Sequence, residues 1–323
     1  MSDLKFKIVV PGDFPVQISG SPRLNSLKQY ADVILYQDLP KTIDEQIARV
    51  QSADIIINSR GSVKWSGEIL KQLPKLKLIS TCSIGTDMID LETAKKCRVI
   101  VSNVPEVTSP VVAEHAFGLI LACAKRGWST TNYLKTHGWT KMTNIYLKGK
   151  TIGIVGMGNT GSKLALMAKN FGMKVVAWTF HPEKYYARYP EIQFLKLKEL
   201  LTIADVVSVH LKLSEDTTKM FSYNEFSMMK KGSIFINCAR GPIIDTNALI
   251  DALNSDHLDS AGLDVFEEEP LNKDAAILQC ENVILTPHCA DSTSEGIDYL
   301  NEGTVKNVLA FIKGTPRNVV TPN

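Results

Sequence analysis

Three charged side chains follow predicted β-strands in the second half of the chain. Arg240 stands in the segment NCARG, Glu269 in LDVFEEEP and His288 in TPH. A guanidinium can hold a carboxylate through two parallel hydrogen bonds. An imidazole, with an ordinary pKa of about 6.5, can give or take a proton near neutral pH. A neighbouring carboxylate favours the imidazolium form and raises its pKa. The trio therefore has the chemistry of an anion clamp beside an acid–base pair.

Each of these residues also has an ordinary structural explanation. Arg240 could cap a turn, Glu269 could belong to a solvated acidic loop, and His288 could be structural. The functional interpretation is favoured because all three follow strands of one predicted parallel sheet, and such sheets bind ligands at the carboxyl edge.

A glycine-rich turn lies upstream of the trio. The segment TIGIVGMGNTGSKLA places Gly156, Gly158 and Gly161 in G-x-G-x-x-G spacing between a predicted strand and a predicted helix. In this context the first glycine permits the tight turn, the second lets a pyrophosphate approach, and the third lets the helix pack on the strand. The helix N-terminus would then face the phosphates. The alternative is a glycine turn without a ligand.

The next strand should end in an acidic residue that binds the adenosine ribose of NAD. Thr179 stands there instead, followed by Phe180, His181, Pro182, Glu183 and Lys184. A threonine does not repel a 2′-phosphate, and His181 or Lys184 could bind one, so NADP is a candidate. Thr179 could equally bond a ribose hydroxyl and leave NAD as the cofactor. The residues leave this choice open.

Together, the glycine turn and the trio predict hydride transfer between a nicotinamide and C2 of a small 2-oxo or 2-hydroxy acid. Arg240 would hold the substrate carboxylate. His288 would protonate the oxygen during reduction and remove the proton during oxidation, with Glu269 supporting its charged form.

Short β-branched runs alternate with amphipathic stretches along almost the whole chain, which predicts α/β architecture with two doubly wound parallel sheets. The first series of strands is expected at 6–10, 33–36, 55–58, 78–81 and 99–102, and the second at 151–155, 174–178, 206–210, 233–237, 260–265 and 283–285. Helices are expected at 42–50 and 91–96. The length of 323 residues also favours two domains at ~150 residues each.

Two further helices are expected. Residues 111–124 (VVAEHAFGLILACA) are apolar around nearly the whole circumference, so this helix must be covered on every side. It is either a buried interdomain helix or part of a subunit interface. The last helix is expected to begin at Ser292, whose S-x-x-E spacing to Glu295 fits a capping box.

Composition narrows the class of partner. The net charge is +2, and no Lys/Arg stripe with interleaved aromatics indicates nucleic acid. We expect no membrane span, no signal peptide and a cytoplasmic protein. The six cysteines contain no C-x-x-C pair and are read as reduced core thiols, with a zinc site as the minor alternative; no metal site is predicted.

The motifs GMGNTG, NCARG, LDVFEEEP and TPH, in this order and spacing, resemble those of the D-2-hydroxyacid dehydrogenase family over nearly the entire chain. The resemblance implies a Rossmann nucleotide-binding domain (104–291) inserted into a flavodoxin-like substrate domain (1–103 and 292–323). It also implies a homodimer joined through the long apolar helix. By the same resemblance, the catalytic trio is Arg240, Glu269 and His288.

The resemblance implies further binding residues. Asn159 and Thr160 would join the glycines at the pyrophosphate, while Cys238, Arg240, Asp264 and His288 would lie near the nicotinamide. The backbone N–H groups of Ile84 and Gly85, in the family-like segment CSIGTD, would hold the substrate carboxylate.

Within the family, NSRGS followed by CSIGTD looks most like 3-phosphoglycerate dehydrogenase without its regulatory domain. Arg60 would then bind the phosphate or distal carboxylate of the substrate, unless it is a surface arginine. Glyoxylate and hydroxypyruvate are alternative substrates. A second class of protein on the same scaffold is a nucleotide-sensing corepressor, whose function is binding rather than catalysis. Thr179, Lys212 and the run from Cys289 to Asp291 depart from the family pattern.

Overall fold

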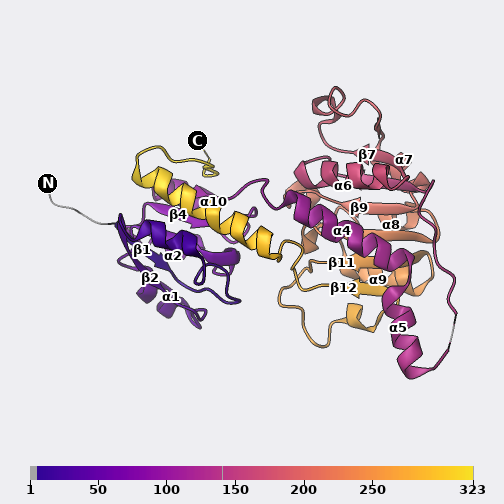
Figure 1. Ribbon diagram of the computed structural model, residues 1–323, viewed down its shortest axis with the longest axis horizontal. Helices are drawn as coiled ribbons and strands as arrows, with labels where there is room; N and C mark the ends of the chain where they lie inside the picture. The colour runs from indigo at the N-terminus through magenta and orange to yellow at the C-terminus, as the bar shows by residue number, and fades with distance from the viewer. Residues whose placement is uncertain (1–5, 140, 323) are drawn as a thin grey trace. The chain divides into compact units, whose positions relative to one another are not determined.

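The computed structural model describes residues 6–139 and 141–322. The chain divides into two compact units (Figure 1). Unit 1 comprises Met1–Thr108 with Thr293–Asn323, and unit 2 comprises Ser109–Ser292. The divisions expected from the sequence were 103/104 and 291/292.

Unit 1 contains a five-stranded parallel sheet in the order β2-β1-β3-β4-β5, which is the flavodoxin-like order. Runs such as IIIN and LIST are buried throughout, as expected for parallel strands covered on both faces. Its strands are β1 (Phe6–Val10), β2 (Ala31–Leu35), β3 (Ile55–Asn58), β4 (Leu78–Thr81) and β5 (Ile100–Ser102). Its α-helices are α1 (Ile43–Val50), α2 (Gly67–Leu70), α3 (Leu91–Lys96) and α10 (Ser294–Ile312).

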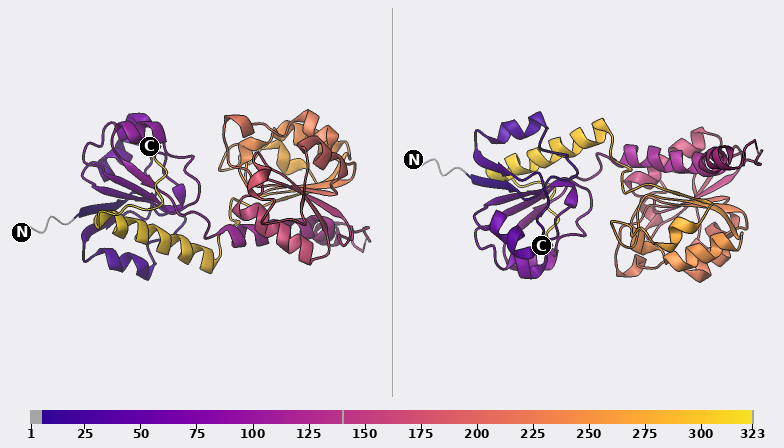
Figure 2. Two further views of the ribbon diagram at one scale, coloured as in Figure 1. Left: turned by 90° about the horizontal axis from the view of Figure 1, so that it is seen from above. Right: turned by 90° about the horizontal axis from the view of Figure 1, so that it is seen from below.

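Alternate residues of the central strands supply two hydrophobic cores in unit 1. The ribbon views of Figure 2 show helices on both faces of this sheet. Val9 and Ile56 belong to the core that contains Val50 of α1 and Leu70 of α2. Ile8 and Ile57 belong to the opposite core, which contains Val308 of α10. The C-terminal helix therefore covers one face of the N-terminal sheet.

Unit 2 contains a seven-stranded parallel sheet in the order β12-β11-β10-β9-β6-β7-β8. Counted from β6, this is the Rossmann order extended by one strand, and the order reverses between β6 and β9. The strands are β6 (Thr151–Val155), β7 (Lys174–Trp178), β8 (Gln193–Phe194), β9 (Val206–Val209), β10 (Ser233–Asn237), β11 (Leu258–Leu263) and β12 (Val283–Leu285). The helices are α4 (Ser109–Ala124), α5 (Gly127–Thr136), α6 (Asn159–Asn170), α7 (Leu197–Ile203), α8 (Tyr223–Met228) and α9 (Thr246–Asn254). The predicted fold class is confirmed for both sheets.

The long apolar helix α4 packs on the sheet of its own unit. This packing was not among the alternatives predicted from the sequence, which were a buried interdomain helix and part of a subunit interface. Ala116, Ile120 and Cys123 are buried in the core that also contains Ile234 of β10 and Leu164 of α6. Gly118 is exposed, and a Cβ built there would meet no atom within 4 Å. One side of α4 therefore packs against β10, β11 and α6.

Three local predictions were wrong or incomplete. The helix expected to be capped by Ser292 is capped by Thr293, whose hydroxyl accepts the N–H of Gly296 at 3.0 Å. Strands β2 and β11 each begin two residues before their expected starts at Val33 and Ser260. The short strand β8 and helix α5 were not predicted, because neither carries a strong apolar period.

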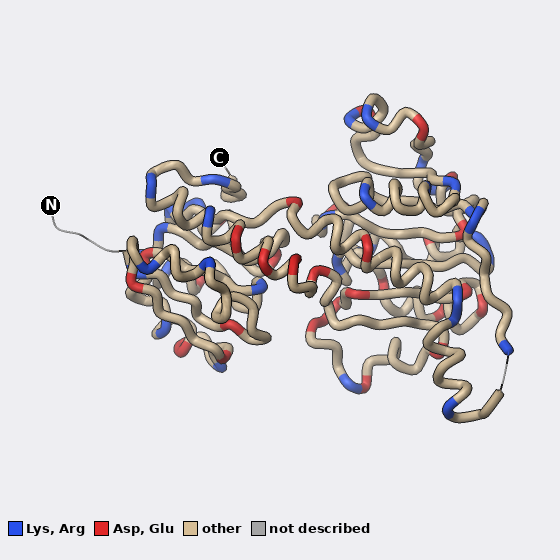
Figure 3. Tube along the Cα trace, viewed as in Figure 1, with Lys and Arg blue, Asp and Glu red and all other residues tan. Residues whose placement is uncertain are grey.

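Lys and Arg are mixed with Asp and Glu along both units (Figure 3). Within the described ranges, no helix is both long and apolar enough for a membrane crossing. All six cysteines are free thiols.

Candidate active site

His288 and Glu269 form a hydrogen-bonded pair. Nδ1 of His288 lies 2.6 Å from Oε2 of Glu269, and Oε1 of Glu269 accepts the N–H of Phe266 at 2.9 Å. The His288 side chain is 47% exposed and that of Glu269 35% exposed, so a small molecule can reach the pair. The structure thus brings these two sequence-predicted residues together.

The pair shifts the pKa of both partners. The hydrogen bond to Glu269 raises the pKa of His288, although partial burial opposes the charged form. Burial alone would raise the pKa of Glu269. The hydrogen bond and charge of His288, the N–H of Phe266 and the charge of Arg240 together more than offset burial and lower that pKa. The arrangement therefore keeps the imidazole protonated to a higher pH than a free histidine.

Arg240 lies near this pair, at the turn after β10. Its positive charge helps to lower the pKa of Glu269 and opposes the raised pKa of His288. The turn is braced by the buried side chain of Asn237, which donates to the carbonyl of Arg240 at 3.0 Å and accepts the N–H of Ala239 at 3.0 Å. The guanidinium also donates to the carbonyl of Ala239 at 2.7 Å. The three predicted charged residues therefore share one electrostatic environment.

Asp264, the residue after β11, organises the turn that carries His288. Its backbone carbonyl accepts the N–H of His288 at 2.8 Å, and its carboxylate accepts the N–H groups of Cys289 at 2.9 Å and Ala290 at 3.0 Å. His288 has φ +48°, in the left-handed region that a residue with a Cβ rarely adopts. The sequence placed Asp264 near the nicotinamide and gave no signal of this structural role.

The glycine turn has the conformation that the motif requires. Gly156 has φ +103°, and a Cβ there would lie 2.5 Å from the carbonyl oxygen of His210. A Cβ on Gly161 would lie 2.0 Å from the carbonyl oxygen of Gly156. Only glycine fits these two positions, because the obstructing atoms are backbone and cannot move aside.

The space in front of this turn fits a dinucleotide phosphate. A Cβ on Gly158 would meet no atom within 4 Å. Gly158 is also the N-cap of α6 and supplies no side-chain cap, so Asn159 and Thr160 open the helix with backbone N–H groups directed at this space. The residues present therefore fit the cofactor that the motif predicts.

The end of β7 carries no carboxylate at position 179. Thr179 is half-buried, and His181 and Lys184 are exposed. In the loop after β7, Oε1 of Glu183 lies 3.4 Å from Nδ1 of His181, so this carboxylate is paired with the histidine. Cys238, at the end of β10, is buried, and its burial raises the pKa of its thiol. Such a thiol stays protonated and packs in the hydrophobic core of unit 2.

The expected substrate residues of unit 1 lie after β3 and β4. Arg60 is half-buried, has φ +51° and donates from Nη1 to Oε1 of Gln17 at 3.3 Å. The carbonyls of Ile84 and Gly85 accept the side chains of Asn103 and Ser83, respectively, at 2.7 Å each. Among the described residues no acceptor takes the N–H of Ile84 or of Gly85. Two backbone donors are therefore available at this loop.

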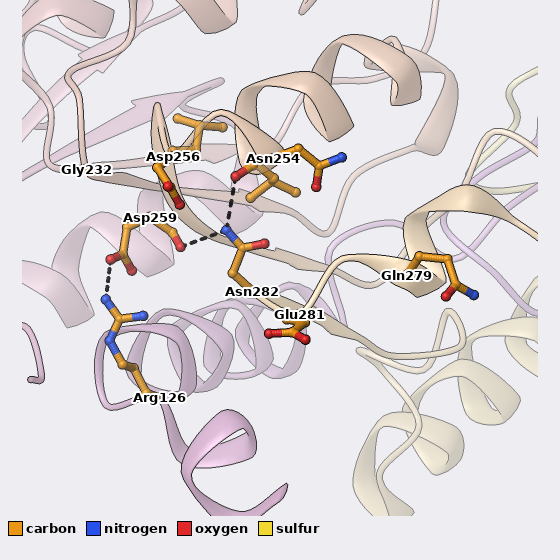
Figure 4. Close-up of a pocket in the computed structure, with 10 residues that line it drawn as sticks. Arg126, Gly232, Asn254, Asp256, Asp259, Gln279, Glu281 and Asn282 are labelled. Atoms are coloured by element: carbon orange, nitrogen blue, oxygen red, sulfur yellow. Dashed lines mark hydrogen bonds and ion pairs between the residues drawn. The ribbon is translucent and has the colours of Figure 1, made fainter. Parts of the chain in front are cut away.

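A cavity of about 440 Å³ lies elsewhere in unit 2, at the amino ends of β11 and β12 (Figure 4). Arg126 pairs there with Asp259, and Asn282 donates to the backbone carbonyl of Asp259 at 3.1 Å. None of the residues predicted to bind cofactor or substrate lines it. The glycine turn and the His288 pair lie at the carboxyl edge of the same sheet.

Comparison with known proteins assigns the family. Residues 117–290 match the family described as "D-isomer specific 2-hydroxyacid dehydrogenase, NAD binding domain". The glyoxylate/hydroxypyruvate reductase B of Klebsiella pneumoniae subsp. pneumoniae is 36% identical over 312 residues, covering 93% of this chain and 94% of that protein.

Two solved structures are similar over nearly the whole length. One is the D-lactate dehydrogenase of Aquifex aeolicus complexed with NAD and lactic acid, with a TM-score of 0.84, 31% identity and coverage of 98% of this chain and 99% of that one. The other is an acyclic imino acid reductase in complex with NADPH and D-Arg, with a TM-score of 0.87, 28% identity and coverage of 97% and 99%.

The Rossmann sheet, the glycine turn and the His288 pair define a nicotinamide-dependent oxidoreductase. This chain belongs to the D-2-hydroxyacid dehydrogenase family, whose members act on 2-hydroxy acids.

Proposed function

We propose that the protein reduces glyoxylate or hydroxypyruvate to the corresponding 2-hydroxy acid, with His288 as the proton donor. The observation that carries this proposal is the 2.6 Å pair of His288 and Glu269 beside the charge of Arg240. The substrate class follows the resemblance to glyoxylate/hydroxypyruvate reductase B. In this proposal unit 2 carries both the glycine turn that holds the cofactor and the charged trio.

The roles of the side chains follow from their charges. A nicotinamide cofactor, held by the glycine turn and the start of α6, would supply hydride to C2 of the substrate. Arg240 holds the substrate carboxylate. His288 gives its proton to the C2 oxygen as negative charge develops there, and Glu269 stabilises the imidazolium before transfer. In the reverse direction neutral His288 takes the hydroxyl proton.

The test is turnover and cofactor binding of His288→Ala. Because the variant lacks the proton donor, kcat should fall by about 10²–10⁴-fold, whereas the Kd for NADH, measured by fluorescence, should stay within threefold. His257→Asn is a matched control, since His257 precedes β11 at the opposite edge of the sheet and contacts the carbonyl of Met229 at 2.9 Å. Unchanged turnover in His288→Ala would reject the role of His288.

A second candidate substrate is 3-phosphohydroxypyruvate, because the half-buried cationic residue Arg60 stands after β3. Arg60→Ala should then raise KM for the phosphorylated substrate at least tenfold more than for glyoxylate. Equal increases in KM for both substrates would show that Arg60 does not bind the phosphate and would remove the argument for the phosphorylated substrate.

For the cofactor, we propose that the site accepts NADPH as well as NADH. Thr179 offers a hydroxyl where a carboxylate would repel the 2′-phosphate, and Lys184 is exposed in the same loop. Steady-state rates with the two cofactors test this directly. A kcat/KM for NADPH more than a thousandfold below that for NADH would reject dual use.

We also propose a homodimer in a reducing, cytoplasmic setting, where six free thiols are stable. Helix α5 has no buried residue, and large apolar side chains are exposed on and after it: Trp128 at 66%, Trp139 at 86% and Tyr146 at 69%. A second copy would cover this surface together with the outer side of α4. Trp128→Glu with Trp139→Glu should give monomers in light scattering; an unchanged mass would move the interface elsewhere.

A further inference from the structure

Thr286 occupies a position between the catalytic turn and helix α4. Its Oγ1 lies 2.6 Å from Oδ1 of Asp264 and 3.1 Å from Nε2 of His115. Thr286 follows β12, Asp264 follows β11, and His115 is on α4, so three separate parts of unit 2 meet at this hydroxyl. Nothing in the proposed chemistry uses Thr286 or His115.

The direction of each hydrogen bond follows from the chemistry of Asp264. A carboxylate only accepts hydrogen bonds, so the hydroxyl of Thr286 must donate its single proton to Asp264. The oxygen of Thr286 is then left as an acceptor for His115. His115 must therefore carry its proton on Nε2, which donates to Thr286.

Asp264 transmits this arrangement to His288. Its side chain is 1% exposed, so its orientation depends on protein donors alone rather than on water. Oδ1 accepts Thr286 and the N–H of Cys289, while Oδ2 accepts the N–H of Ala290. The backbone carbonyl of Asp264 also accepts the N–H of His288. Asp264 therefore accepts three successive backbone N–H groups, those of residues 288–290.

We propose that Thr286 and His115 are positioning residues that orient the Asp264 carboxylate, and through it hold His288 in its left-handed conformation beside Glu269. This inference rests on the proposed role of His288 as the proton donor. His115 and Thr286 touch neither substrate nor cofactor in this scheme. They act by limiting the movement of the turn that contains residues 288–290.

The first test is Thr286→Val, which keeps the shape of the side chain and removes the hydroxyl. Asp264 loses one donor and His115 loses its acceptor, so the turn loosens. We expect kcat to fall about 10- to 100-fold, because displacement of a reacting group by about 1 Å costs that much. The Kd for NADH, measured by fluorescence without turnover, should stay within threefold. Thr286→Ser keeps the hydroxyl and should recover most of the rate.

The pH profile separates positioning from a loss of folded protein. Reduction needs protonated His288, whose pKa is raised by Glu269. A looser turn weakens this pair, so the high-pH limb of kcat/KM should move to lower pH in Thr286→Val. A smaller fraction of folded enzyme would lower the rate at every pH and leave the limb in place. That result, or a Thr286→Ser variant as impaired as Thr286→Val, would overturn the proposal.

His115 provides an independent variant if Thr286→Val does not fold. His115→Phe fills similar space without a donor and should shift the same pH limb, whereas His115→Gln retains an N–H and should shift it less. Wild-type rates and profiles in His115→Phe would remove His115 from the network. His288→Ala, measured in parallel, separates the proposed function from the positioning proposal. Full activity in His288→Ala would reject the role of His288 as the proton donor. Loss of activity in His288→Ala with normal activity in Thr286→Val would reject only the positioning role.

Discussion

Oε2 of Glu269 accepts the hydrogen bond of His288 Nδ1 across 2.6 Å, while Oε1 of the same carboxylate accepts the N–H of Phe266. Both carboxylate oxygens are thus held, and within the described part of the chain no hydrogen-bond partner takes Nε2 of the imidazole. This relationship decides which protonation state of His288 is favoured and therefore the pH range of each reaction direction.

Replacing Glu269 with Gln should move the high-pH limb of the reduction rate to lower pH. The carboxylate raises the pKa of His288, and a neutral amide removes that effect, so the limb should approach the ordinary value of about 6.5. The measurement is kcat/KM for glyoxylate between pH 5 and 9. Glu268→Gln, which lies on the adjacent exposed position, is the control. An unmoved limb in Glu269→Gln would contradict the assignment.

The same pair should give a modest pH dependence of stability. His288 has a raised pKa, so its contribution is complete below about pH 6.5 and is lost as pH rises through the folded-state pKa. Glu269 has a lowered pKa, so its contribution is present above about pH 4.3 and is lost in acid. Wild type and Glu269→Gln should therefore differ most between these limits, by less than about 1 kcal/mol because both side chains are partly exposed. Urea unfolding at pH 3.5, 5.5 and 9 checks this, and equal differences at all three pH values would contradict it.

Two glycines of the turn should separate folding from cofactor binding. Gly161→Ala puts a Cβ 2.0 Å from a backbone carbonyl and should destabilise the fold by about 1–3 kcal/mol. Gly158→Ala meets no protein atom within 4 Å, so Tm should not fall, but the methyl group enters the phosphate space. NADH should bind at least about tenfold more weakly to this variant. Normal NADH affinity in Gly158→Ala would place the cofactor elsewhere.

Thr179→Asp should shift cofactor preference toward NADH. The new carboxylate can accept the adenosine ribose hydroxyls and repels a 2′-phosphate. We expect the ratio of kcat/KM for NADPH to that for NADH to fall at least about tenfold, because like charges in contact cost more than 1.4 kcal/mol. Thr179→Ala controls for loss of the threonine itself. A ratio unaffected by the carboxylate would show that the ribose lies away from the end of β7.

The stability of unit 1 should depend on the buried carboxylate of Asp13. Asp13 is 0% exposed and accepts the N–H groups of Gln17, Ile18 and Ser19 and the hydroxyl of Ser59. Asp13→Asn replaces one acceptor with a donor and should lower the free energy of unfolding by about 1–3 kcal/mol.

The pH dependence of this effect has a defined sign. Burial opposes ionisation of Asp13, but its hydrogen bonds overcome burial and lower its pKa. The stabilisation is therefore present above about pH 3.9 and is lost in stronger acid. The difference between wild type and Asp13→Asn should narrow below that pH in denaturant titrations. Asp32→Asn, on an exposed position of β2, should change stability by less than about 0.5 kcal/mol; an equal loss there would show that the effect is not specific to the buried site.

Most of the fold could be predicted because parallel strands buried on both faces leave continuous apolar runs. The runs at β3, β4, β6, β7, β10 and β12 have the bounds that the sequence indicated. Helix α5 could not be predicted in this way because it buries no side chain and so carries no apolar period. The cap of α10 was misplaced by one residue because Ser292 and Thr293 are both good caps, and only the backbone geometry selects Thr293.

The candidate site was predictable where charged side chains stand in the segments that follow strands of the parallel sheet. His288, Glu269 and Arg240 each follow one, and the sheet brings His288 and Glu269 into contact. The role of Asp264 as the acceptor for the His288 turn was not predictable, since it depends on N–H groups that every residue possesses. The contribution of His115 depends on the packing of α4, which an apolar pattern does not orient.

Asp264 is hydrogen-bonded to Asn237 of β10 through its N–H, to the segment after β12 through its carbonyl and carboxylate and, through Thr286, to α4. Under the positioning proposal, the geometry of the His288 turn depends on β10, on the segment after β12 and on α4 together, so a change that displaces any one of them should also disturb the proton donor.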